Sequence, residues 1–256
     1  MGMTKQYEKP NLTYFLITIC IIVFIFEIFY ALQHGNFGDE NFKNSLADLF
    51  VNYGFSLQNL LSKKYWVFIT SIFFHADPEH LVLNMLALFF FGRVVELELG
   101  RKKFLLIFFL SSFVGSLAFL VPSFFGVSNF GSVIGASAAI FGLMGTAMLV
   151  KPLEFVFYPY LIPVPLILVA MLYTLYNIAS FLLVAANLQE SDISYISHIA
   201  GLATGMFFGF KEEGSKKGFI ILLFLLILLI ITPFIWLIFK YLEIFNYIAV
   251  LSKFFK

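Results

Sequence analysis

Gly135-Ala-Ser137-Ala-Ala-Ile-Phe-Gly142-Leu-Met-Gly145 opens a short apolar segment, 136–151, in which small side chains recur on one helical face. A second short segment, 196–210, carries His198 near its start and then small residues at four-residue spacing, Gly201, Gly205 and Gly209. Small residues let two helix backbones approach closely inside a membrane. We therefore predict that both segments are buried helices packed through these faces, which brings His198 within hydrogen-bond reach of Ser137.

The composition around these segments is that of a membrane protein. Of the 256 residues, 61% are hydrophobic and only 12% are charged, and the mean hydropathy is +0.95. These values lie far from those of an average soluble domain. A formal net charge of +1 argues against a nucleic-acid partner, and the single Cys20 excludes a disulfide framework or a cysteine-based metal site.

Apolar runs near the 20-residue length of a membrane-spanning helix predict an all-α polytopic protein. We expect a short cytoplasmic N-terminus at 1–10 and a six-helix core over 11–210, followed by an additional transmembrane helix and a C-terminal tail, 241–256. The stretch 33–77 mixes charged and apolar residues, so we expect a partly helical, interfacial loop there. The predicted spans are 11–32, 78–98, 103–125, 136–151, 160–187, 196–210 and 218–240.

The distribution of basic residues predicts the orientation of these spans. With the N-terminus in the cytoplasm, ten of the 16 Lys and Arg residues fall on the cytoplasmic side. In this topology the spans 78–98, 136–151 and 196–210 all begin at the outer side. A candidate site formed by their first turns would therefore open to the outer face.

The polar residues of the chain gather at those three helix starts. His80 and Asn84 are four residues apart, which places them on one face of a helix. Ser137 begins its segment, where free backbone N–H groups and the helix dipole favour a developing oxyanion. A serine beside His198 suits nucleophilic catalysis. Since the carboxylates of Glu96 and other acidic residues lie elsewhere, the sequence predicts a Ser–His dyad.

Three blocks of the sequence, in order and at suitable spacing, resemble the rhomboid family of intramembrane serine proteases over about 65–210. The blocks are His75-Ala-Asp-Pro-Glu-His80-Leu-Val-Leu-Asn84 with its continuation to Gly100, Gly135 to Gly145, and Ser197-His198-Ile-Ala-Gly201-Leu-Ala-Thr-Gly205. The resemblance implies a six-helix core, here followed by a seventh helix at 218–240. It also implies helix 5 and its neighbouring loop as the entry for substrates.

The resemblance implies an intramembrane serine endopeptidase that cleaves transmembrane or juxtamembrane segments of other membrane proteins, in contact with lipid and without metal or cofactor. It implies Ser137 as the nucleophile and His198 as the general base. The oxyanion hole would use the Ser137 amide with His80 and Asn84. Supporting positions are Gly135, Phe141, Gly201 and Gly205, with Phe141 stacked beneath His198.

Two other functions stay open at this point. A pseudoprotease would bind membrane segments without cutting them; it is disfavoured because both Ser137 and His198 are present. However, Ala138 follows the serine where the family usually has Gly, and its methyl could tighten the helix contact or crowd the oxyanion site. A zinc site or transporter could instead use the ligands His75, Asp77, Glu79, His80 and His198.

Overall fold

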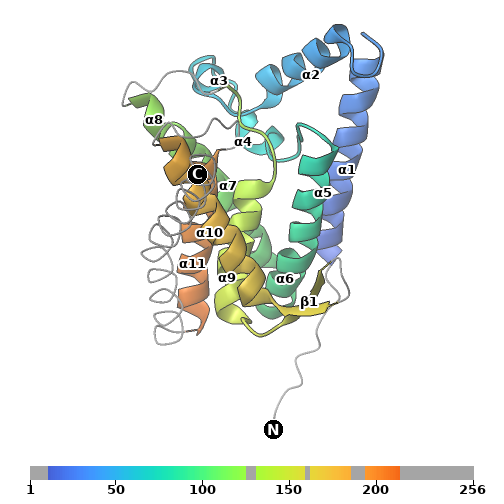
Figure 1. Ribbon diagram of the computed structural model, residues 1–256. Coiled ribbons are helices and arrows are strands. Elements are labelled where there is room, and N and C mark those ends of the chain that lie inside the picture. Colours follow the sequence, from blue (N-terminus) through green and yellow to red (C-terminus); the bar gives the residue numbers. More distant parts are fainter. Residues whose placement is uncertain (1–10, 125–130, 159–161, 186–193, 214–256) are drawn as a thin grey trace, which may run out of the picture.

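The computed structural model describes residues 11–124, 131–158, 162–185 and 194–213, and these form a helix bundle (Figure 1). Within this part of the chain, four helical stretches are long and apolar enough to cross a membrane: Asn11–Leu32, Pro78–Leu99, Arg101–Phe119 and Leu166–Val184. Ser137–Val150 is a shorter apolar helix. The predicted spans 218–240 and the segments 1–10 and 241–256 lie outside the described residues.

The helix bounds follow the apolar runs closely. The two helices that carry the serine and histidine blocks are α9 (Ser137–Val150) and α11 (Tyr195–Glu213), and α1 covers Asn11–Leu32. The third predicted span is divided into α7 (Arg101–Phe119) and α8 (Val121–Phe124). Pro122 explains the division, because a proline lacks the N–H that would continue the α7 ladder.

The second predicted span is one continuous helical stretch with an irregular centre. It consists of α5 (Pro78–Ala87), a π-helical turn η1 (Leu88–Gly92) and α6 (Arg93–Leu99). At its start, Pro78 occupies the first helical position and the Asp77 side chain accepts a hydrogen bond from the His80 amide at 2.8 Å. This cap fixes the first turn of α5, on which His80 lies.

Three short helices occupy the stretch 33–77: α2 (Glu40–Tyr53), α3 (Leu57–Leu61) and α4 (Val67–Thr70). Asp39 caps α2 through Phe42 N, and the backbone N–H groups of Phe42 and Asn36 hold the pKa of this carboxyl below its usual range. In Figure 1, α2 and α3 lie at one end of the bundle and β1 (Phe155–Tyr158) at the other.

The prediction of helix over residues 162–165 is wrong. Residues Phe155–Tyr158 and Ile162–Pro165 (β2) pair as a two-stranded antiparallel sheet, with Phe155 opposite Pro165. Pro163 and Pro165 explain this local departure from an all-α fold, because prolines disrupt a helix interior and restrict the residues before them to extended backbone. The fifth span, α10 (Leu166–Ala185), therefore begins directly after Pro165.

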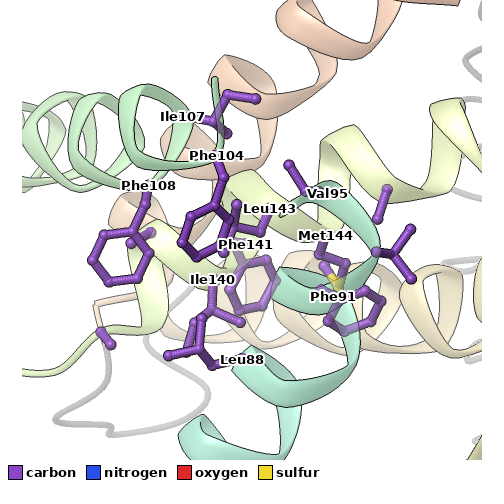
Figure 2. Close-up of a cluster of buried hydrophobic side chains, with 14 of the residues drawn as sticks. Leu88, Phe91, Val95, Phe104, Ile107, Phe108, Ile140, Phe141, Leu143 and Met144 are labelled. Atoms are coloured by element: carbon purple, nitrogen blue, oxygen red, sulfur yellow. The ribbon is translucent and has the colours of Figure 1, made fainter. Parts of the chain in front are cut away.

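The core of the bundle is formed where η1 and α6 meet α7 and α9. Figure 2 shows the apolar side chains of these elements converging: Leu88, Phe91, Val95, Phe104, Ile107, Phe108, Ile140, Phe141, Leu143 and Met144. Nearly every residue of α9 is buried, so this short helix is enclosed by its neighbours. The first turn of α9 is thereby held in a fixed position, and that turn carries Ser137.

Candidate active site

The two helices with small-residue faces pack backbone to backbone, as the sequence predicts. A Cβ added at Gly201 would collide with the carbonyl oxygen of Ala138, and one added at Gly205 would collide with that of Gly142. Thr146 of α9 donates a hydrogen bond to the Gly205 carbonyl at 2.8 Å. These contacts leave no room for side chains between α9 and α11, and they bring the first turns of the two helices together.

Ser137 and His198 meet at this end of the α9–α11 contact. Nε2 of His198 lies 2.7 Å from Oγ of Ser137, within hydrogen-bond distance. Phe141, one turn along α9, stacks under the imidazole with ring centroids 4.5 Å apart and an interplanar angle of 10°. The predicted stack is therefore present, and it leaves the histidine ring little freedom to rotate.

Asn177 of α10 is a third polar residue of the site, and it is absent from the residues predicted from the sequence. Its Oδ1 lies 2.6 Å from Nδ1 of His198, and its Nδ2 donates to the Tyr195 carbonyl at 3.1 Å. The side chain is buried. A signal was present in the sequence, because an asparagine inside an apolar span generally has a specific partner.

His80 faces Ser137's helix from α5 and lies against Gly135. An ideal Cβ at Gly135 would come within 2.8 Å of Cε1 and Nε2 of the His80 ring, and Gly135 has a φ of +111° that L side chains rarely adopt. Nδ1 of His80 accepts a hydrogen bond from the Ala76 amide at 3.3 Å. Because Nδ1 is an acceptor, the neutral ring carries its proton on Nε2. The edge of His80 beside Gly135 is therefore a hydrogen-bond donor.

Asn84 is buried one turn after His80, on the same face of α5. One N–H of its side-chain amide is used within the helix, where Nδ2 donates to the His80 carbonyl at 2.8 Å. An amide group has two N–H donors, so the second can serve another acceptor. The structure thus places His80 against Gly135, two residues before Ser137, and Asn84 one turn further along α5.

The segment before α5 is anchored from α1. Glu27, fully buried in α1, accepts a hydrogen bond from the His75 amide at 3.2 Å, and the His75 ring packs edge-on against His80 with centroids 5.2 Å apart. His75 is itself fully buried, and its Nδ1 lies 3.1 Å from the Phe73 carbonyl. These contacts give His75 a structural role in the segment before α5.

Two of the residues considered for zinc have other partners. Asp77 caps α5, and His198 contacts Ser137 and Asn177. In the described part of the chain, no three His, Cys, Asp or Glu side chains converge as a metal site requires.

Two further residues singled out in the sequence have packing roles. The Ala138 methyl faces Gly115 of α7, where an added Cβ would come within 2.8 Å of it. The methyl is accommodated because the facing residue has no side chain. Glu96 is buried at the opposite end of the bundle, where it accepts hydrogen bonds from the amides of Asn11, Leu12 and Thr13. It therefore caps α1 and takes no part in the candidate site.

Comparison with known proteins agrees with this geometry. The family profile described as "Rhomboid domain" matches residues 62–213. The rhomboid protease GluP of Bacillus subtilis (strain 168) is 32% identical over 146 residues, covering 57% of this chain and 25% of GluP. The putative rhomboid protease YdcA of the same organism is 35% identical over 82 residues, covering 32% and 39%.

A plant relative gives the same result. The RHOMBOID-like protein 12, mitochondrial, of Arabidopsis thaliana is 28% identical over 165 residues, covering 59% of this chain and 48% of that protein. The chain thus spans less than half the length of each of these three relatives. The profile match, together with the membrane-length apolar helices, makes this chain a multi-pass integral membrane protein of the rhomboid family.

Proposed function

We propose that the protein is an intramembrane serine endopeptidase that cleaves transmembrane or juxtamembrane segments of other membrane proteins with a Ser137–His198 dyad. The observation that carries the proposal is the 2.7 Å contact between His198 Nε2 and Ser137 Oγ. A serine hydroxyl is a weak nucleophile unless a base within hydrogen-bond distance accepts its proton. The contact supplies that base, and the names of the relatives as proteases support the same reaction.

In this mechanism the Ser137 Oγ attacks the carbonyl carbon of the scissile peptide while His198 Nε2 takes the hydroxyl proton. The tetrahedral intermediate carries its negative charge on the former carbonyl oxygen. His198 then returns the proton to the leaving amine nitrogen as the C–N bond breaks. A water molecule, deprotonated by the same imidazole, releases the acyl group from Ser137. This sequence consumes one water and regenerates the site.

The oxyanion hole would combine the Ser137 backbone N–H with the side chains of His80 and Asn84. The N–H groups of the first turn of α9 have no carbonyl partner within the helix, and they lie at the positive end of its dipole. His80 adds a donor, because Ala76 N–H leaves its proton on Nε2. Preorganised donors of this kind stabilise the charge that develops in the transition state.

We also propose how the chain is oriented in the membrane. We place the N-terminus in the cytoplasm, six spans over 11–210 and a seventh at 218–240, so that Ser137 lies toward the outer face. The interfacial loop, 33–77, would cover the site from that side. Transmembrane proteins are the substrates, lipid is the solvent, and neither metal nor cofactor enters the reaction.

The test is cleavage of a reporter transmembrane substrate by the purified protein in liposomes. Parent, Ser137→Ala and His198→Ala are compared, with Ser116→Ala as a matched control, because Ser116 is also a buried helical serine but lies on α7. We expect cleavage by the parent and the control, and a loss on the order of 10⁶-fold in both dyad variants. A parent that binds reporters without cutting any of them would instead favour the pseudoprotease.

A further inference from the structure

We infer that Asn177 is a positioning residue for catalysis, which holds His198 in the orientation and tautomer that can accept the Ser137 proton. This inference rests on the proposed function. The contacts of Asn177 connect three helices. The residue lies on α10, its amide oxygen contacts His198 of α11, and His198 in turn contacts Ser137 of α9.

The orientation of the Asn177 amide follows from its two contacts. A backbone carbonyl can only accept hydrogen bonds, so the atom 3.1 Å from the Tyr195 oxygen must be the NH₂ group. The carbonyl oxygen Oδ1 of the amide therefore faces Nδ1 of His198, at 2.6 Å. The Tyr195 carbonyl, three residues before His198, thus fixes which end of the amide His198 meets.

The amide in turn fixes the tautomer of His198. Because Asn177 Oδ1 is an acceptor, Nδ1 of the neutral imidazole must carry the proton and donate it. Nε2 then has a free lone pair, and it is Nε2 that lies 2.7 Å from Ser137 Oγ. The other tautomer would direct an N–H at the serine and could not accept its proton. Asn177 therefore selects the one neutral form of His198 that works as a base.

Burial makes this selection effective. Asn177 is 3% exposed, and the Phe141 ring covers one face of the imidazole. Leaving either Asn177 Oδ1 or His198 Nδ1–H without a partner would cost the desolvation energy of a buried polar group. An orienting acceptor on the second nitrogen of the catalytic histidine is the arrangement of other serine and cysteine proteases, and here a neutral amide supplies it from a separate helix.

The experiment compares Asn177→Leu and Asn177→Asp with the parent in the liposome assay. Leucine has a similar size but no acceptor, and aspartate keeps an acceptor oxygen toward His198. For Asn177→Leu we expect kcat to fall on the order of 100-fold, the scale of general-base catalysis, with little change in KM. Asn177→Asp should recover most of that loss. Thr174→Val is the matched control, since Thr174 is buried on α10 and donates its hydrogen bond to the Ala170 carbonyl of the same helix.

Equal kcat values in Asn177→Leu and Thr174→Val would overturn the inference, and so would an Asn177→Asp variant no better than Asn177→Leu. If the parent itself cleaves nothing, the proposed function fails but this inference is still testable. ¹⁵N NMR of the histidine rings should then show a proton on Nδ1 of His198 in the parent and its loss from that position in Asn177→Leu. An unchanged His198 spectrum in Asn177→Leu would contradict the role of Asn177.

Discussion

His198 contacts Ser137 and His80 lies against Gly135, two residues earlier, and the Nδ1 atoms of the two histidines have opposite partners. Nδ1 of His198 faces an acceptor, Asn177 Oδ1, whereas Nδ1 of His80 faces a donor, the Ala76 amide. The Nε2 atoms therefore differ: that of His198 is a base and that of His80 is a donor. In the proposed mechanism the same side chain thus serves two opposite roles, and the hydrogen-bond partner of Nδ1 in each ring decides which one.

The largest expected effect comes from replacing each histidine with glutamine. His198→Gln removes the base, and we expect a loss of kcat on the order of 10⁶-fold. His80→Gln keeps a side-chain N–H donor in place of the imidazole, so its loss should stay below about 10³-fold, the upper range for one oxyanion donor. Single-turnover cleavage in liposomes measures both. Losses of equal size would contradict the division of roles.

The next-largest effect is expected from a substitution that displaces the His80 ring from Gly135. Gly135→Ala places a Cβ against the His80 ring and forces an L side chain into a φ of +111°. We expect kcat to fall about 100-fold or more, because the oxyanion donor is displaced. Gly131→Ala is the control, since an added Cβ there meets no atom of the described residues within 4 Å. Comparable activity of the two variants would show that the close contact at Gly135 is not required.

Much of this arrangement could be predicted from the sequence. The small faces of α9 and α11 and the position of Ser137 follow from residue spacing, because helical periodicity fixes which side chains share a face. The stack of Phe141 on His198 is implied by the resemblance to the rhomboid family. Asn177 could not be placed in the same way. It lies on α10, in no recognisable block, and hydropathy alone does not determine the rotation of that helix.

The Nδ1 partner of His80 was equally inaccessible to sequence reasoning. It is a backbone amide, that of Ala76, and any residue type could provide it. The β1–β2 hairpin was missed for a different reason. Its residues are apolar enough to extend a membrane helix, so hydropathy predicts a helix there, whereas Pro163 and Pro165 favour extended backbone.

A smaller loss of activity is expected from substitutions of Phe141, whose ring stacks on His198. Phe141→Leu keeps the apolar volume but removes the ring stacked at 4.5 Å. An aromatic pair contributes about 0.5–1.5 kcal/mol beyond burial, so kcat should fall about 2- to 10-fold. Phe141→Tyr, which preserves the stack, should stay close to the parent. The comparison needs only steady-state rates, and a loss in Phe141→Tyr equal to that in Phe141→Leu would count against stacking as the cause.

The smallest effect is expected from substitutions of Glu27, whose carboxylate anchors the segment before His80. Glu27→Gln keeps an acceptor for the His75 amide, so we expect cleavage near the parent rate. Glu27→Leu leaves that buried amide unpaired, which should cost about 1–3 kcal/mol of stability. Thermal unfolding in detergent measures the difference. If both variants unfold like the parent, the α1 anchor does not hold the segment that carries Ala76.

The opposite roles proposed for His198 and His80 depend on the tautomers of their rings. ¹⁵N NMR of the histidine rings measures these tautomers without any substrate. The chain has only four histidines, so single His→Gln variants suffice to assign the signals. We expect neutral His198 to carry its proton on Nδ1 and neutral His80 to carry its proton on Nε2. The same tautomer in both rings would contradict the assignment of one histidine as base and the other as oxyanion donor.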